Sequence, residues 1–123
     1  MNVVLWVLQG LLAALYATAG VLKTTQPKDK LAARLPWTED FSAATVKVIG
    51  SAELLGALGL ILPAATGILP WLTPLAATGL AVVMLLAVLT HARRKEPQGI
   101  AFAFVLLVLA AFVAWARFGP YSL

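Results

Sequence analysis

The sequence predicts an all-α integral membrane protein, folded as an antiparallel bundle of four transmembrane helices. Of its 123 residues, 62% are hydrophobic and only 11% are charged, whereas soluble domains average about 45–50% apolar and about 25% charged residues. The apolar residues also form four continuous stretches, each long enough to cross a hydrocarbon core of about 30 Å. We therefore expect residues 1–123 to form a single transmembrane domain.

The four expected helices cover approximately residues 2–23, 43–62, 71–91 and 100–118. Their apolar runs lack the alternation of outer-membrane strands, and unpaired backbone cannot face lipid, so helices are favoured. Pro63, Pro70 and Pro74 bracket the second connection, because proline ends one helix and can begin the next. The long first connection contains KDKLAARL, which suits a short interfacial helix, followed by Trp37 at headgroup depth.

The basic residues predict the orientation of the chain. Four spans place the first and third connections on one face and both termini on the other. Most of the lysines and arginines lie in or beside those two connections, and only Arg117 marks the terminal face. The positive-inside bias therefore predicts cytoplasmic loops at 24–42 and 92–99, with both termini outside. This explains the net charge of +4 without nucleic acid as a partner.

Glu53 is the most informative polar residue, because it lies near the centre of the second apolar stretch. An ionisable group in lipid costs at least about 2.5–3.5 kcal/mol and normally faces the bundle interior beside a partner. Lys47, six residues earlier, points about 120° away around the helix, so the two cannot pair along one face. Glu53 must therefore find a partner on another helix or stay protonated.

The first helix offers partners, because Gln9, Tyr16 and Lys23 are spaced seven residues apart and form one polar stripe. Aligning the helix centres predicts an interior polar track whose members are, from outside to inside, Gln9, Glu53, Tyr16, Lys47, then His91 and Lys23.

The alternative is that these groups only fix helix register through interhelical hydrogen bonds, typically worth about 0.6 kcal/mol each. That interpretation is favoured for Gln9, whereas a functional role is favoured for Glu53. Lys47 is evenly balanced, since its long stem can also reach the headgroups. His91, Lys23 and Arg117 are interpreted first as interfacial or end residues.

Small residues indicate where helices approach closely in lipid. Gly10, Ala14 and Thr18 on the first helix, and Ala52 and Gly56 on the second, have the four-residue spacing of such packing faces.

Two segments, VLWVLQGLLAALYATAGVLK and VIGSAELLGALGLILPAATGILPWLTPLAATGLAVVMLLAVLTHARR, resemble the DoxX-like family of small four-helix bacterial membrane proteins. The most specific features are the G-x-x-E-x-x-G-A-x-G-L run at residues 50–60 and the third-helix ending with His91. The resemblance implies that Lys23, Glu53 and His91 face a shared interior site in the bacterial cytoplasmic (inner) membrane. It also implies a link to redox complexes, since DoxD relatives are described as subunits of a thiosulfate:quinone oxidoreductase.

The chain has no cysteine and one histidine, so it offers no thiolate metal site and cannot hold a bis-histidine haem alone. No nucleophile–base pair is evident, and no catalytic or metal-binding residue is assigned. The first functional hypothesis is a binding module or accessory subunit that holds a quinone or lipid at Glu53, Lys47, Tyr16, Gln9, Lys23 and His91. A quinone is the only candidate cofactor.

Two other hypotheses remain open. The chain could pass protons or a solute, with Glu53 as the relay, or act as a structural interaction subunit whose buried charge pairs with another protein. Expected partners are the lipid bilayer and either further copies of the chain or a redox subunit.

Overall fold

A computed structural model describes residues 1–122, apart from the Lys28 side chain, and confirms the all-α prediction for that range. The Lys28 side chain, one of the basic groups of the first connection, and Leu123 lie outside the described part. Four of the helices are long and apolar enough to cross a membrane. The elements in chain order are α1 (Asn2–Thr25), α2 (Lys28–Arg34), the 3-10 helix η1 (Pro36–Asp40), α3 (Ala43–Thr66), α4 (Leu72–Arg93) and α5 (Pro97–Phe118).

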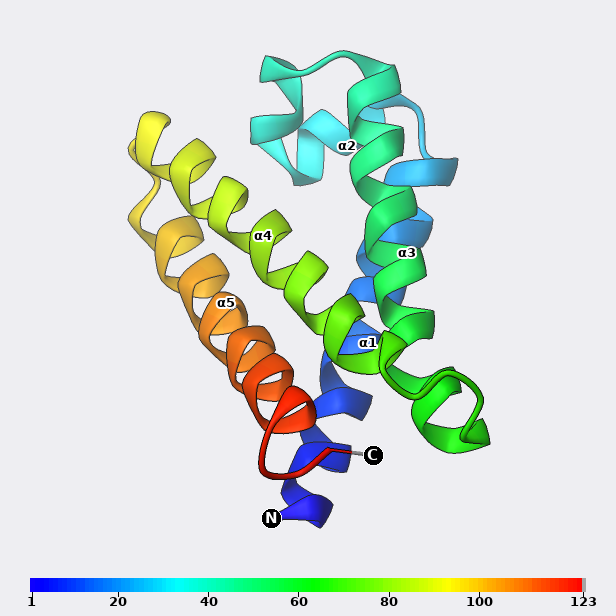
Figure 1. Ribbon diagram of the computed structural model, residues 1–123. Helices are drawn as coiled ribbons and strands as arrows, with labels where there is room; N and C mark the ends of the chain where they lie inside the picture. Colours follow the sequence, from blue (N-terminus) through cyan, green and yellow to red (C-terminus); the bar gives the residue numbers. More distant parts are fainter. Residues whose placement is uncertain (123) are drawn as a thin grey trace.

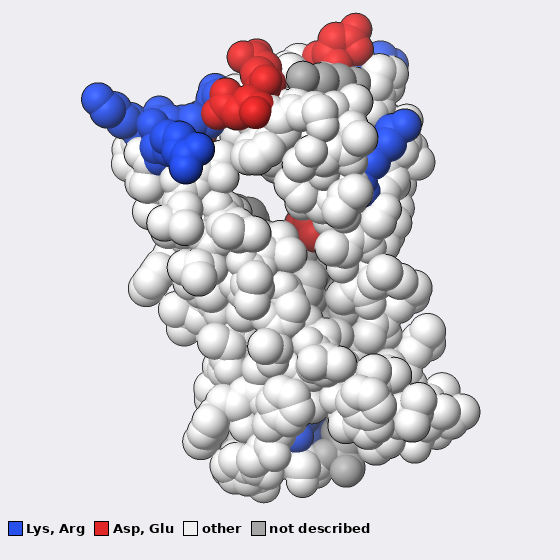
Figure 2. Space-filling model, turned by 45° about the horizontal axis from the view of Figure 1, so that its top comes forward, with Lys and Arg blue, Asp and Glu red and all other residues white. Residues whose placement is uncertain are grey.

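The two ends of the bundle differ in character. The connection end carries α2, η1 and the tight turn between α4 and α5, whereas the terminal end carries both termini and the turn from α3 to α4 (Figure 1). This is the arrangement that four antiparallel spans predict. Figure 2 shows most of the charged side chains gathered at the connection end, above a largely uncharged body.

The bundle consists of two helix pairs. α1 packs along α3, and α4 packs along α5, while α3–α4 and a smaller α1–α5 contact join the pairs. Toward the connection end, α4 and α5 lean away from α3 (Figure 1). The pairs are therefore held together most closely near the terminal end.

Apolar side chains occupy both the inside and the outside of the bundle. Leu12, Leu60 and Leu80 are among the fully buried core residues, yet Leu55 and Phe102 are mostly exposed on the outer faces. Exposed apolar surface on this scale is unfavourable in water and suited to acyl chains. The fold therefore places its polar groups inside or at the connection end.

A close approach of α1 and α3 depends on two glycines. A Cβ atom on Gly20 would lie 2.7 Å from the Gly50 carbonyl oxygen, and one on Gly50 would lie 2.6 Å from the Lys23 Cβ. Of the small residues named in the sequence, Gly56 lies at a close approach, since a Cβ there would be 2.5 Å from a Leu80 side-chain carbon, whereas a Cβ on Gly10 would meet no atom within 4 Å. The packing face of α1 lies instead around Gly20, next to Lys23.

Pro63, which was expected to end the second span, lies inside α3, and the helix continues to Thr66. Proline has no N–H, so the Gly59 carbonyl one turn earlier loses its usual helical donor. The Thr73 hydroxyl of α4 donates to that carbonyl at 2.9 Å and replaces the lost bond. The helix ends at Gly67, whose φ of 73° is the left-handed conformation that favours glycine.

Candidate functional site

Among the described residues six polar side chains are buried, and three of them are ionisable. They are Gln9, Lys23, Thr38, Glu53, Thr73 and Arg117. A buried polar group needs a partner, because leaving it unpaired costs about 1–3 kcal/mol, and more when it is charged. The partners of these groups therefore define where the interior chemistry lies.

The central feature is an ion pair between α1 and α3. The Lys23 Nζ donates to Glu53 Oε1 at 2.6 Å, and the glutamate side chain is only 2% exposed. Lys23 and Glu53 each follow a crossing glycine by three residues, so both lie on the helix faces that meet there. The Lys23 ammonium also lies 5.1 Å from the centroid of the Trp37 ring in η1, a cation–π arrangement.

Lys23 is therefore the partner that the position of Glu53 requires, although its place at a helix end first suggested a headgroup anchor. Lys23 is buried because α2 and η1 cover the end of α1. This tertiary contact cannot be predicted from the local sequence pattern.

Tyr16 lies about two turns before Lys23 on the same face of α1. Its side chain is 1% exposed, and its hydroxyl has no hydrogen-bond partner among the described residues. In the register set by Gly20 and Gly50, Tyr16 lies at about the depth of Glu53. A buried donor left unpaired beside an ion pair is a polar group available to a ligand.

The order of the polar residues differs from the order that the helix centres predicted. Gln9 donates to the Leu60 carbonyl at 2.6 Å, while Gly20 faces Gly50. In this register Tyr16 lies beyond Gln9 at about the depth of Glu53, and Lys23 follows toward the connection end. The expected alignment was shifted because α1 and α3 continue to Thr25 and Thr66, beyond the ends expected for the two spans.

Lys47 does not join the interior track. Its side chain is exposed, because Val46, Gly50 and Glu53 form the buried face of α3 and Lys47 points well away from it. The prediction that Lys47 belongs to the interior polar track was therefore wrong.

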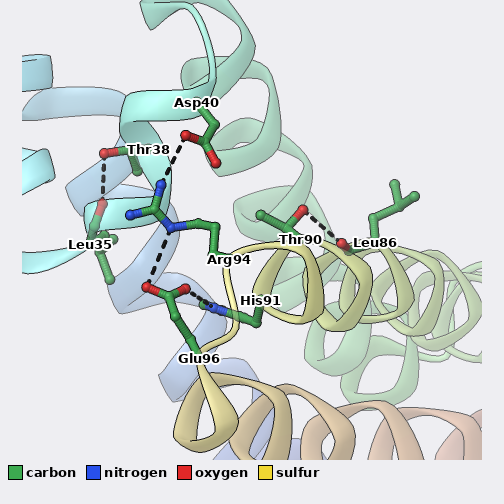
Figure 3. A network of polar contacts seen from close by, with 8 residues as sticks. All are labelled: Leu35, Thr38, Asp40, Leu86, Thr90, His91, Arg94 and Glu96. Carbon is green, nitrogen blue, oxygen red and sulfur yellow. Dashed lines mark hydrogen bonds and ion pairs between the residues drawn. The ribbon is translucent and has the colours of Figure 1, made fainter.

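His91 belongs to a different cluster at the connection end (Figure 3). Its Nδ1 lies 2.8 Å from Glu96 Oε1, and Arg94 contacts Asp40 at 2.9 Å and Glu96 at 3.4 Å. Hydrogen bonding from His91 and the Arg94 guanidinium lowers the pKa of Glu96 below its usual range. The cluster ties the α4–α5 turn to η1 and is separate from the Lys23–Glu53 pair.

A second buried group at the terminal end was not predicted. Arg117 of α5 is 3% exposed and donates to Gln9 Oε1 at 2.8 Å and to Asn2 Oδ1 at 2.7 Å. Gln9 thereby joins α1, α3 and α5, in keeping with the register-fixing interpretation. The available signal was topological: because both termini share one end, Arg117 near the end of α5 must lie close to the beginning of α1.

A hollow opens in the surface toward the interior. Figure 2 shows acidic atoms set back in this hollow, well below the charged rim of the connection end. The hollow faces the side where α4 leans away from α3 (Figure 1). Acidic atoms are therefore visible from this side of the bundle (Figure 2), although the Glu53 side chain is only 2% exposed.

The arrangement suits binding and proton exchange. Lys23 and Glu53 share a short charge-assisted hydrogen bond, and Tyr16 offers a free donor. Among residues 1–122, no group of three histidine, cysteine, aspartate or glutamate side chains is placed to hold a metal ion.

Fold and site together define a multi-pass membrane protein with a buried ion pair between its first and second spans. The family model described as the DoxX-like family matches residues 7–113. The chain belongs to the DoxX-like family, as its sequence resemblance implied. Neither the curated proteins nor the solved structures gave a match.

Proposed function

We propose that this protein is a membrane-embedded binding module or accessory subunit that holds a small amphipathic ligand at Tyr16, Lys23 and Glu53. The observation that carries the proposal is the Tyr16 hydroxyl, which is buried and has no hydrogen-bond partner among the described residues. Tyr16 lies on the same face of α1 as Lys23, the ion-pair partner of Glu53. The ligand chemistry that fits is a carbonyl group on an apolar body, as in a quinone or in an ester-linked lipid.

The residues have separate roles in this proposal. The Tyr16 hydroxyl donates a hydrogen bond to the ligand carbonyl, and the surrounding leucines contact its apolar body. Glu53, held by Lys23, is positioned to give or accept a proton at the bound group. A bound quinone would supply electron and proton transfer. The chain has no cysteine and therefore no thiol redox chemistry of its own.

Three features support a carbonyl ligand. The unpaired phenol is a donor that a ligand carbonyl can satisfy. A hollow in the surface has acidic atoms set back in it (Figure 2), and the outer helix faces are apolar. The DoxD relatives, described as subunits of a thiosulfate:quinone oxidoreductase, also favour a quinone. Lys47 and His91 are left out of this site because they lie elsewhere.

Thermal unfolding in detergent, with and without decylubiquinone, tests the proposal. Wild type should be stabilised by the quinone, whereas Tyr16→Phe and Glu53→Gln should lose most of the shift. Tyr121→Phe and Glu39→Gln are matched controls at exposed positions and should keep it. The same assay is repeated with an ester lipid and with its ether analogue, which lacks the carbonyl. Stabilisation by the ester lipid and not by the ether analogue would identify a lipid carbonyl, and stabilisation by decylubiquinone alone would identify a quinone.

The result that would contradict the proposal is an equal shift in wild type and both site variants. Proton flux in liposomes distinguishes this binding proposal from the hypothesis that Glu53 relays protons. Among the described residues no hydrogen bond joins the Gln9–Arg117 group to Tyr16, so flux should stay at the level of empty vesicles. Glu53-dependent flux would favour the relay instead.

A further inference from the structure

A cleft at the connection end carries a charge pattern that the interior site does not use. The cleft has a volume of about 310 Å³ and lies where the end of α1, α2 and the beginning of α3 meet. Its walls include Lys23, Gln26, Leu31, Ala43, Val46 and Lys47. Both charged residues of the lining are cations, and no acidic residue takes part.

The two lysines of the cleft differ in whether their ammonium groups already have a partner. The Lys23 ammonium is committed to Glu53 at 2.6 Å and to the Trp37 ring. Lys47 is exposed and forms no ion pair within 4.0 Å among the described residues. Lys47 is therefore the cation of the cleft that is free to meet an anion.

The depth of the cleft suits a lipid headgroup. Lys47 lies four residues after the beginning of α3, about 6 Å along the axis. The 24 residues of α3 extend about 3 Å beyond each side of the hydrocarbon core, so Lys47 lies close to the boundary where its long stem reaches the headgroups. Pro27 and Ala43 are exposed apolar residues of the same cleft, beside the buried Leu31 and Val46. The lining therefore combines a cation at headgroup depth with an apolar wall where an acyl chain begins.

We infer that this cleft binds one anionic lipid, with its phosphate at Lys47 and the beginning of an acyl chain against Pro27 and Ala43. Basic pockets between transmembrane helices are a general form of anionic-lipid site. This site shares the Lys23 wall with the interior site, but it requires a phosphate at Lys47, and neither Tyr16 nor Glu53 lines it. Each can therefore fail without the other.

Titration of phosphatidylglycerol into the detergent-purified full chain, followed by native mass spectrometry, tests this inference. Wild type should bind one phosphatidylglycerol more tightly than phosphatidylcholine, and Lys47→Gln should weaken that binding about fivefold. Lys30→Gln removes the same charge from an exposed position of α2 outside the cleft and should bind as wild type does. Ala43→Phe keeps Lys47 but fills the cleft, and it should also lose the selective binding.

Two outcomes would overturn the inference. Equal losses in Lys47→Gln and Lys30→Gln would show only a diffuse attraction between a basic surface and anionic lipid. Stabilisation by inorganic phosphate alone, equal to that by the lipid, would show an anion site with no role for the apolar wall. The inference is supported only if the lipid binds selectively and both cleft variants lose it.

Discussion

Replacing Lys23 with methionine is the sharpest perturbation of the interior. Methionine keeps the length and most of the apolar stem of lysine but removes the ammonium. Glu53 would then remain 2% exposed with no cation beside it. Since the pair joins α1 to α3, the variant tests whether the charge, and not the packing, holds that contact.

The magnitude follows from the 2.6 Å separation of Nζ and Oε1. At an effective dielectric constant near 20, two unit charges at this distance attract by about 6 kcal/mol. Desolvation of the two ions costs several kcal/mol each, so the intact pair is roughly neutral against an apolar replacement. Losing Lys23 removes both the attraction and the desolvation cost of the ammonium, but the desolvation cost of Glu53 remains. We therefore expect Lys23→Met to lower the free energy of unfolding by about 3 kcal/mol.

A double-variant cycle completes the test. Lys23→Met combined with Glu53→Leu removes both charges, and it should recover to within about 1 kcal/mol of wild type or exceed it. Unfolding by sodium dodecyl sulfate, followed by tryptophan fluorescence, gives the free energies. Lys30→Met, at an exposed lysine, controls for loss of positive charge. A cost below about 1 kcal/mol for Lys23→Met, or a double variant worse than the single one, would refute the reasoning.

Three further predictions concern other parts of the fold. Tyr16→Phe should leave the ligand-free protein as stable as wild type or more stable, because the deleted hydroxyl has no partner; it should weaken quinone binding about fivefold, and a clear loss of ligand-free stability would contradict this. Thr73→Val should cost about 1 kcal/mol by stranding the Gly59 carbonyl beside Pro63; Thr78→Val, which removes a bond only within α4, should cost less, and equal costs would be evidence against the compensation. The pKa of Glu96 is lowered on folding. Its contribution to the free energy of unfolding is therefore present above the ordinary glutamate pKa and is lost as the pH falls through the lowered value. The stability of Glu96→Gln should lack this acid decline, and stability curves of wild type and variant that run parallel from neutral to acidic pH would contradict the prediction.

The sequence predicted the four spans because hydrophobic length is a local property that lipid enforces. The helix ends were less predictable. Pro63 ends a helix only when nothing replaces its missing hydrogen bond, and Thr73 of the next helix supplies the replacement. α5 begins at Pro97, earlier than expected, because proline fits the first helical position.

The interior site was predictable in part. Glu53 and Tyr16 were identified from depth and seven-residue spacing, and both are buried. The pairing of Glu53 with Lys23 depends on the Gly20–Gly50 crossing, which sets the helix stagger and is a tertiary property. Lys47 was placed inside the bundle although it points about 120° away from Glu53 around α3. The burial of Arg117 was not predicted because its partners Asn2 and Gln9 lie at the other end of the chain.

Mass spectrometry of the molecules that remain bound to the gently purified protein tests the central claim most directly. We predict that a quinone or another carbonyl-bearing amphipathic molecule is enriched over the bulk membrane extract in wild type and in Glu39→Gln. The same molecule should be depleted in both Tyr16→Phe and Glu53→Gln. Identical profiles in all four proteins, matching the bulk membrane, would contradict the account.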